Sequence, residues 1–392
     1  MGRSVETPER FHALDAVRAA AMLLGILFHA MCSFAETPVG WAARDRSTSL
    51  AVDVLLWGLH AFRMPVFFLM SGFFARLLHE RLGPAGFVRH RAKRLLVPFL
   101  VALPFVMASL WALWTWGFER QAARPAPPRS LYPGLPPGVG PRTMLTGPGH
   151  LWFLYYLLLI QAAAAIVARL GRLGERTDRV VRGLAGSPLL PFVMALPTGA
   201  TLALMKGFEA ETPVSFVPQP AVLAFYAVFF AAGWLLHRQP GLVPRLARHL
   251  WLPPIIAALL FPVLGSQLEE LVRAGRFASS ARRLGSVYLL GTFTWSLVLF
   301  FIALFVRWLR EPRAWVRWLA DASYGAYLIH LPVVILLQIL VMDLAWPGPL
   351  KYGVVAGGTL AVCLGSYRAF VRYTFLGTAL NGKRERPATC PP

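Results

Sequence analysis

The sequence predicts an all-α membrane protein: a polytopic bundle of about ten transmembrane helices with both termini in the cytoplasm. Composition is the first observation, because 57% of the 392 residues are hydrophobic and only 15% are charged, whereas a soluble chain carries roughly 25% charged residues. The second is that apolar runs of about 20 residues, enough to cross a bilayer core of roughly 30 Å, recur along the whole chain. The third is an alternation of Lys and Arg between successive loops. Together these features exclude a soluble, fibrous or disordered protein.

Ten apolar segments, whose ends are marked by Pro and Gly, are predicted to be spanning helices. In chain order they are residues 12–34, 53–75, 95–117, 150–168, 189–206, 220–237, 250–268, 284–306, 321–342 and 352–371. In the second segment, Asp53, His60 and Arg63 dilute the apolar run. The Pro- and Gly-rich stretch 125–149 is expected to be an extended loop and not a separate domain.

Charge gives the expected orientation. Lys and Arg number 39 against 18 Asp and Glu, a net charge of +21, and such an excess first suggests a nucleic-acid partner. The positions argue otherwise: 25 of the 39 lie in the amino-terminal tail and every second loop, 12 lie in the intervening loops, and Arg18 and Arg63 lie within spans. Because positive loops stay cytoplasmic, we expect cytoplasmic tails at residues 1–9 and 376–392, a membrane domain at 10–375, and no nucleic-acid partner. Asp15, Arg18 and His29 disfavour a cleaved signal peptide at the amino terminus.

Several kinds of site are not indicated. The three cysteines, Cys32, Cys363 and Cys390, form no CxxC or Cys/His pattern, so the sequence implies neither a disulfide framework nor a metal site. The GxSxG, P-loop, HExxH and GxGxxG motifs are also missing. Histidine and arginine are the polar residues that recur in the apolar segments.

The first span carries three ionisable residues, which are costly in a membrane and by default mark a functional site. Arg18 and His29 are eleven positions apart, three turns plus about 20°, so they share one helix face with a rise of about 16 Å between them. Asp15 lies one turn before Arg18, where it orients or neutralises the guanidinium. The alternative is that Arg18 reaches the interface and His29 is a satisfied core histidine.

The second span and the loop after it carry further candidates. Arg63, with His60 one turn before it, needs an acceptor inside the bundle, either Asp53 or a substrate oxygen; structural pairing and substrate contact are both open. Arg91 and Arg94 lie at i and i+3, side by side on a helix, and arginine forks bind phosphate. A plain cytoplasmic basic loop explains that pair equally.

The fourth and ninth spans add aromatic and histidine residues. His150 and Trp152 open the fourth span from the outer side, where an interfacial aromatic belt accounts for Trp152 and His150 is placed to line a vestibule for a sugar. Ser323, Tyr327 and His330 follow i, i+4, i+7 spacing, so they form one stripe. The stripe is expected to face the bundle interior; contact with substrate is a separate question that the spacing leaves open.

These motifs resemble the acyltransferase 3 family of integral membrane acyltransferases, and within it most nearly the branch that succinylates periplasmic glucans. Arg18 and His29 match the family pattern of Arg, ten residues, then His, and Arg91 and Arg94 match its Arg-x-x-Arg motif. Further matches span residues 12 to 332: Leu14–Asp15, Met22–Gly25, Phe28–His29, His60–Met64, Phe67–Phe68, Ser71–Gly72, His150–Leu154, Ala322–Ser323 and Tyr327–His330. Ala19 departs from the Gly often found after the first arginine. No SGNH-type esterase domain follows the tenth span, so a second transfer step is expected to need another protein.

The resemblance implies a multi-pass enzyme of the bacterial inner membrane that moves an acyl group, succinyl or acetyl, from cytoplasmic acyl-CoA to hydroxyls of an extracytoplasmic glycan. It implies acyl-CoA as co-substrate with no permanently bound cofactor, a carbohydrate acceptor, membrane lipid around the bundle and glycan-synthesis proteins as candidate partners. Histidine has an ordinary pKa of about 6.5 and suits general-base work, so His29 is expected to deprotonate the acceptor hydroxyl. A transient acyl-histidine is the less favoured variant.

The remaining assignments follow from the same resemblance. Arg18 and Asp15 are expected to assist His29, and Arg91 and Arg94 to bind acyl-CoA. The candidates for acceptor or oxyanion contacts are His60, Arg63, His150, Trp152, Ser323, Tyr327 and His330. Two other functions stay open on the sequence: a transporter of an anionic or sugar-like substrate, which buried arginines and histidines also suit, and a non-catalytic membrane subunit of a glycan assembly complex.

Overall fold

The computed structural model describes residues 11–37, 40–122, 147–170, 174–213, 215–275, 277–309 and 311–374. Within these ranges the chain is helical and has no strand, apart from an isolated bridge between Ala35 and Ser49. The α-helices are α1 (His12–Met31), α2 (Leu50–Arg91), α3 (Val97–Ala122), α5 (Trp152–Leu170), α6 (Glu175–Leu184), α7 (Leu190–Ala203), α8 (Pro220–His237), α9 (Leu252–Ala274), α10 (Ser280–Trp308), α11 (Ala314–Val341) and α12 (Gly348–Ser366). The all-α class is therefore confirmed. The tails expected at residues 1–9 and 376–392, both ends of the 10–375 domain, and most of the loop at 125–149 lie outside the described residues.

Eight segments of the described chain are long and apolar enough to cross a membrane, so the protein is a multi-pass membrane protein. All ten expected spans fall on helices, but three of them differ from expectation: the second and third are joined, and the fifth is short. The segment Leu50–Ala122 holds the second and third expected spans in one continuous helical stretch. The fifth, Leu190–Ala203, has only 14 residues, or about 21 Å of helix, which is shorter than the bilayer core. The orientation of the termini stays a prediction.

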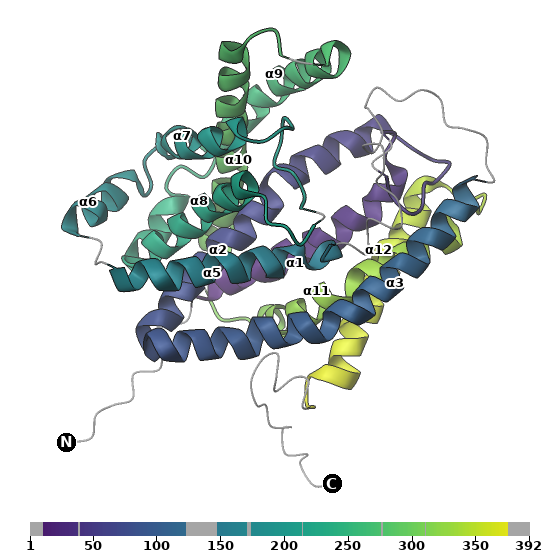
Figure 1. Cartoon of the computed structure of the whole chain (residues 1–392), viewed down its shortest axis with the longest axis horizontal. Coiled ribbons are helices and arrows are strands. Elements are labelled where there is room, and N and C mark those ends of the chain that lie inside the picture. Colours follow the sequence, from purple (N-terminus) through teal and green to yellow (C-terminus); the bar gives the residue numbers. More distant parts are fainter. Residues whose placement is uncertain are drawn as a thin grey trace.

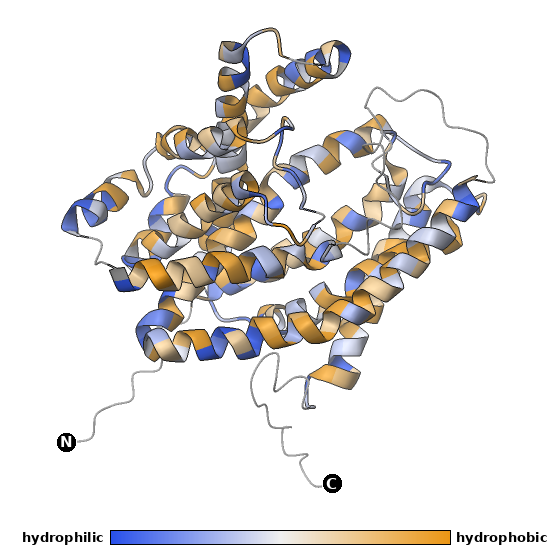
Figure 2. Cartoon of the chain, in the orientation of Figure 1, coloured by the Kyte–Doolittle hydropathy of each residue, from blue (hydrophilic) through white to orange (hydrophobic). Residues whose placement is uncertain are grey.

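The helices pack around α1, α2, α10 and α11 (Figure 1). α1 lies against α11 and α2, α2 crosses α8, and α7 lies against α10. α9 and the adjoining end of α10 stand apart from the rest of the bundle. Colouring by hydropathy shows apolar residues over most of the long helices, with polar residues towards helix ends and along α6 (Figure 2).

The α2–α8 crossing depends on two glycines, Gly72 of α2 and Gly233 of α8, each of which lies against the backbone of the other helix. A Cβ on Gly72 would overlap the carbonyl of Phe230, and a Cβ on Gly233 would overlap the carbonyl of Leu69. Small residues let helices approach closely in a membrane, where packing replaces the hydrophobic effect between helices. An alanine at Gly72 or Gly233 would therefore push the two helices apart.

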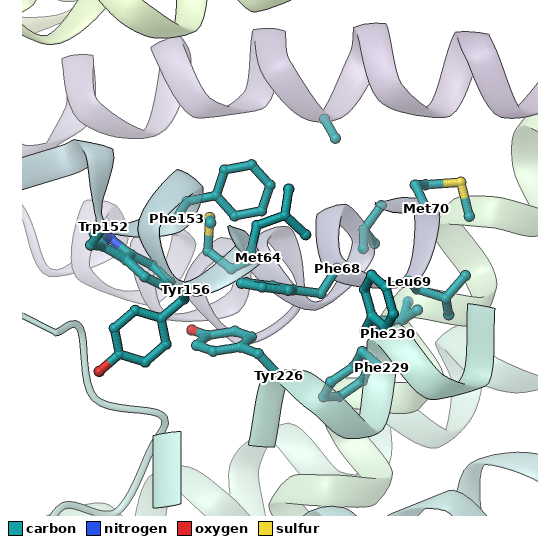
Figure 3. Close-up of a cluster of buried hydrophobic side chains, with 14 of the residues drawn as sticks. Met64, Phe68, Leu69, Met70, Trp152, Phe153, Tyr156, Tyr226, Phe229 and Phe230 are labelled. Atoms are coloured by element: carbon teal, nitrogen blue, oxygen red, sulfur yellow. The ribbon is translucent and has the colours of Figure 1, made fainter. Parts of the chain in front are cut away.

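Aromatic rings fill the space beside this crossing (Figure 3). Phe68 of α2 stacks on Tyr226 of α8, with ring centroids 4.4 Å apart, and meets Phe153 of α5 edge-on at 5.1 Å. Trp152 packs against Tyr226 at 5.3 Å and Tyr156 at 5.8 Å. These rings join α2 to α5 and α8, whereas Arg63 of α2, described below, lies against Phe28 of α1.

α2 turns sharply before it reaches α3. Gly83 has φ 67° inside α2, a backbone conformation that only glycine adopts without strain, and Pro84 then starts a second helical run. The run passes into a π-helix, η2 (Ala92–Leu96), which leads to α3. Arg91 and Arg94 therefore lie on a bent connection between two spans.

Residues 169–182, expected to be a basic loop, include the short amphipathic helix α6. Two nitrogens of Arg238, at the end of α8, donate to the carboxylate of Asp178 at 2.7 Å each. These hydrogen bonds hold the pKa of Asp178 below its ordinary value. The ion pair ties α6 to α8 at this end of the bundle.

The segment between α1 and α2 is fixed by α3 and α12. The Lys351 ammonium of α12 donates to both carboxylate oxygens of Asp45 at 2.9 Å, and each side chain is only 1% exposed. From α3, the Gln121 amide donates to the carbonyls of Trp41 and Ala42. This segment therefore holds Trp41 in one place over the end of α1.

Candidate active site

His29, in the last turn of α1, lies where α1, α11 and the segment after α1 meet. Its ring stacks on the indole of Trp41, with centroids 5.5 Å apart and planes 13° apart. The ring of His330, from α11, lies 5.3 Å away on another side. The Nδ1 atom of His29 is buried and has no hydrogen-bond partner. A ring nitrogen in that state is available to exchange a proton with a bound hydroxyl.

His330 and His150 continue the line of imidazoles. Their ring centroids are 5.2 Å apart, and both bind the carbonyl of Tyr327, through His330 Nδ1 at 2.8 Å and His150 Nε2 at 3.1 Å. Because a carbonyl can only accept, each of these nitrogens is the donor, and this assigns the tautomers of both neutral rings. His150 Nδ1 is then an acceptor without a partner. We call His29, His150 and His330 the histidine cluster.

Tyr327 completes the link between α11 and the start of α5. Its hydroxyl donates to the carbonyl of His150 at 2.7 Å, while its own carbonyl accepts from His150 Nε2. The exchange fixes the short turn η3 (Gly149–Leu151) against α11. Tyr327 therefore positions the histidines as well as lying among them.

Arg63, from α2, brings a positive charge to the cluster. Its side chain is 7% exposed, its guanidinium carbon lies 4.1 Å from the ring centre of Phe28, and its charge acts on both His29 and His330. Nη1 lies 3.5 Å from the carbonyl of Gly25, a weak hydrogen bond, and Nε has no partner.

Asp53, one of the two acceptors suggested for Arg63, does not pair with it. The Asp53 carboxylate accepts instead from the backbone N–H groups of Glu36 and Thr37 and from the Thr37 hydroxyl. Among the described residues no carboxylate forms an ion pair with Arg63. A buried guanidinium of this kind is placed to stabilise negative charge on a ligand.

The remaining expected residues divide between the cluster and its surroundings. His60 stacks on Phe28 at 6.1 Å and its Nε2 lies 3.3 Å from the carbonyl of Ala210, which places it at the edge of the cluster. Ser323, Tyr327 and His330 are all buried, as expected for one stripe that faces the bundle interior. The Ser323 hydroxyl donates to the carbonyl of Ala320 on its own helix at 2.7 Å. Trp152 belongs to the aromatic core of Figure 3, where its ring packs on Phe68, Tyr156 and Tyr226 and not on the histidines.

Two residues of the site were missed by the sequence analysis. Trp41 donates from its indole N–H to Gln338 Oε1 at 2.7 Å, and Gln338 Nε2 donates to the carbonyls of His29 and Ala30 at 2.9 and 3.1 Å. Gln338 thus joins the ring that stacks on His29 to the backbone of His29. Gln338 could have been found from the sequence, because it is an amide within the apolar run of α11. Nothing in the sequence indicated Trp41, which lies in a connecting segment.

Arginines gather at the other end of α1. Arg18 lies 3.5 Å from Asp15 and over the ring of Phe74, so the pairing predicted one turn apart is confirmed. The Arg91 guanidinium is near enough to Arg18 for their charges to interact, and its Nε is buried without a partner. Arg94 interacts with the hydroxyl of Tyr324 on α11. We call Arg18, Arg91 and Arg94 the arginine end.

The two sets differ in the chemistry they support. The histidine cluster offers proton-accepting nitrogens beside a buried cation, the arrangement that general-base attack with oxyanion stabilisation requires. The arginine end offers guanidinium groups that suit a phosphorylated ligand. Arg91 directly precedes the π-helix η2 and Arg94 lies within it, and π-helices are found frequently at functional sites. α1 joins the two over about 16 Å.

A scan against protein-family models matches residues 11–368 to an acyltransferase domain, that of the acyltransferase 3 family. Among curated proteins, the chain is 26% identical over 258 residues to the glucans biosynthesis protein C of Salmonella schwarzengrund and to that of Salmonella typhi. It is 26% identical over 242 residues to the protein of the same name from Escherichia coli. The chain spans 62% of the length of the Salmonella relatives and 60% of the Escherichia coli relative. No solved structure matches.

Proposed function

The chain belongs to the acyltransferase 3 family, and from this premise we propose that it is a membrane-bound O-acyltransferase of the bacterial inner membrane. It takes an acyl group, succinyl or acetyl, from cytoplasmic acyl-CoA and transfers it to a hydroxyl of an extracytoplasmic glycan. The observation that carries the proposal is the meeting of His29, His330 and His150 beside Arg63 inside an apolar bundle.

In this reaction His29 is the general base. It accepts the proton of the acceptor hydroxyl while the oxygen attacks the thioester carbonyl carbon, and the carbonyl oxygen becomes an oxyanion that Arg63 stabilises. The carbon–sulfur bond then breaks, and the CoA thiolate takes the proton back from the imidazolium. The unpartnered Nδ1 of His29 and the unpartnered Nε of Arg63 support these two roles.

The donor enters at the arginine end. Arg91 and Arg94 bind its phosphates, and Arg18, paired with Asp15, lies beside them where the acyl arm passes along α1. The excess of Lys and Arg in the loops on this side supports a cytoplasmic position for it and for both termini.

The acceptor enters at the histidine cluster from the outer side. His60, His150, Tyr327 and His330 offer donors and acceptors there, and the indole of Trp41 offers an apolar face of the kind that packs on a sugar ring. The similarity to proteins named glucans biosynthesis protein C supports a glucan or related glycan as acceptor.

Purified protein in liposomes tests the function. With acyl-CoA labelled in the acyl group and a glycan acceptor on opposite sides of the membrane, we expect label in the glycan only when acyl-CoA faces the side of the amino terminus. Transfer must also continue in detergent, where no gradient exists. Movement of an intact substrate across the liposome with no acylated product would overturn the proposal and favour a transporter.

A further inference from the structure

A cleft of about 340 Å³ opens next to the arginine end, and the mechanism above does not use it. Its walls are the start of α1, the connection from α10 to α11, the first two turns of α11, and Arg372, which follows the π-helix η5 (Tyr367–Val371). We call it the α1–α11 cleft. Its volume lies in the range of small-molecule sites, roughly 300–1,000 Å³.

The lining of the cleft mixes three kinds of group. Arg313, Arg317 and Arg372 supply guanidinium groups, and the Nε of Arg372 is buried without a hydrogen-bond partner. Asp15, Glu311 and Asp321 supply carboxylates, and Trp318 supplies an indole. A simple inorganic anion would be repelled by the carboxylates and would gain nothing from the indole.

This mixture fits a nucleotide. Guanidinium groups bind phosphate oxygens in forked geometry, carboxylates accept from amino and ribose hydroxyl groups, and an indole face stacks on a base. Each kind of group on the cleft wall therefore has a counterpart on an adenosine phosphate.

Two lines of contact join the cleft to the arginine end. On α1, Asp15 lies in the cleft wall and pairs with Arg18, whose charge acts on Arg91. On α11, Asp321 lies in the cleft wall one turn before Tyr324, whose hydroxyl interacts with Arg94. A ligand whose head fills the cleft thus has its next groups beside Arg91 and Arg94.

We propose that the α1–α11 cleft binds the adenosine 3′-phosphate head of the acyl-CoA donor. The pyrophosphate then meets Arg91 and Arg94, and the narrow pantetheine arm follows α1 to His29, about 21 Å from Asp15 along the helix axis. This inference rests on the proposed function, because it assigns a further part of the same donor.

The test compares two donors: acyl-CoA, and acyl-phosphopantetheine, which lacks the adenosine 3′-phosphate head and the phosphate that joins it to the arm. The Arg313→Gln/Arg317→Gln variant removes two exposed side chains of the cleft, so it is expected to fold. We expect its KM for acyl-CoA to rise about ten-fold and its KM for acyl-phosphopantetheine to stay unchanged. Arg307→Gln, an exposed arginine on the same side of the molecule and outside the cleft, is the matched control and should alter neither value.

An unchanged KM for acyl-CoA in the double variant, or an equal rise for both donors, would overturn the inference. Failure of the proposed function looks different, because the wild-type protein would then transfer from neither donor. In that case calorimetry with adenosine 3′,5′-bisphosphate decides on the cleft. Binding to wild type that weakens in the double variant supports the site, and no binding to wild type rejects it.

Discussion

The histidine cluster and the arginine end lie on one helix, α1, and differ in how far water reaches their charges. At the arginine end the side chains of Arg18 and Asp15 remain 40% and 32% exposed, and each has the other as its counter-ion. At the histidine cluster Arg63 is 7% and His330 is 3% exposed, and no carboxylate of the described chain pairs with Arg63. At the arginine end, Arg18 is partly hydrated and has a carboxylate partner; at the histidine cluster, Arg63 is buried and has none. We call the first the wet end and the second the dry end.

The difference indicates separate tasks. Charges in a wet site are screened, so they capture a charged ligand and contribute little to the fold. A cation in a dry site interacts strongly with nearby charge and cannot be compensated by solvent, so it suits a charge that develops during a reaction. We therefore expect substitutions at the dry end to act on kcat and substitutions at the wet end to act on the KM of the donor.

The largest effect is expected at His29. His29→Ala removes the proposed base, so kcat should fall roughly 10²-fold or more, the usual scale for general-base loss. Rates with purified protein, together with membrane levels and melting temperature, check this. His249→Ala alters an exposed histidine outside both sites and should leave kcat unchanged. Near-normal turnover of His29→Ala would contradict the assignment of the acyl-transfer step to the histidine cluster.

A smaller effect is expected from Gln338, which holds Trp41 and the end of α1 together. Gln338→Leu leaves the Trp41 N–H and the His29 carbonyl without this partner, so we expect kcat to fall about thirty-fold, or about 2 kcal/mol, with little change in donor KM. Steady-state kinetics measure the split. Gln161→Leu is the matched control, because Gln161 is a buried amide whose polar atoms have no partner. A rise in donor KM without loss of kcat would contradict the assignment of Gln338 to the dry end.

The smallest effect is expected at the wet end. Arg91→Lys/Arg94→Lys keeps both charges and loses the forked geometry that binds phosphate. The KM for acyl-CoA should rise about ten-fold, while kcat and the KM for the glycan change little. Arg81→Lys, an exposed arginine of the same basic region, serves as control. If the donor KM is unchanged with normal expression, these arginines only set topology.

The sequence predicted the helices better than their ends. Apolar runs near the bilayer thickness located every spanning segment, because that thickness sets the length of the run. The bend of α2 at Gly83 was not predicted, since a single glycine in a long helical pattern does not show whether or in which direction the helix bends. α6 was taken for a loop because it has only 10 residues and is polar on average, although its helical period is clear.

The site was predicted in part, for a physical reason. Arg18 paired with Asp15 as expected because helix geometry fixes neighbours one turn apart. The pairing of Arg63 with Asp53 was wrong because it depended on how a connecting segment folds back, and the N–H groups of residues 36 and 37 bind that carboxylate. Trp41 was missed for the same reason. Local spacing predicts contacts within a helix. Contacts between a connecting segment and a distant helix can be predicted only once the fold is known.

The buried ion pair between Asp45 and Lys351 sets an order of events during synthesis. The two residues are 306 positions apart. Because the chain is made from its amino terminus, α12, which carries Lys351, leaves the ribosome after every other α-helix of the described residues. Until α12 inserts, the segment that carries Trp41 has its hydrogen bonds to Gln121 of α3 and Gln338 of α11, and Asp45 lacks the Lys351 ammonium. The segment that places the Trp41 ring on His29 is therefore fully fixed only after α12 has been delivered.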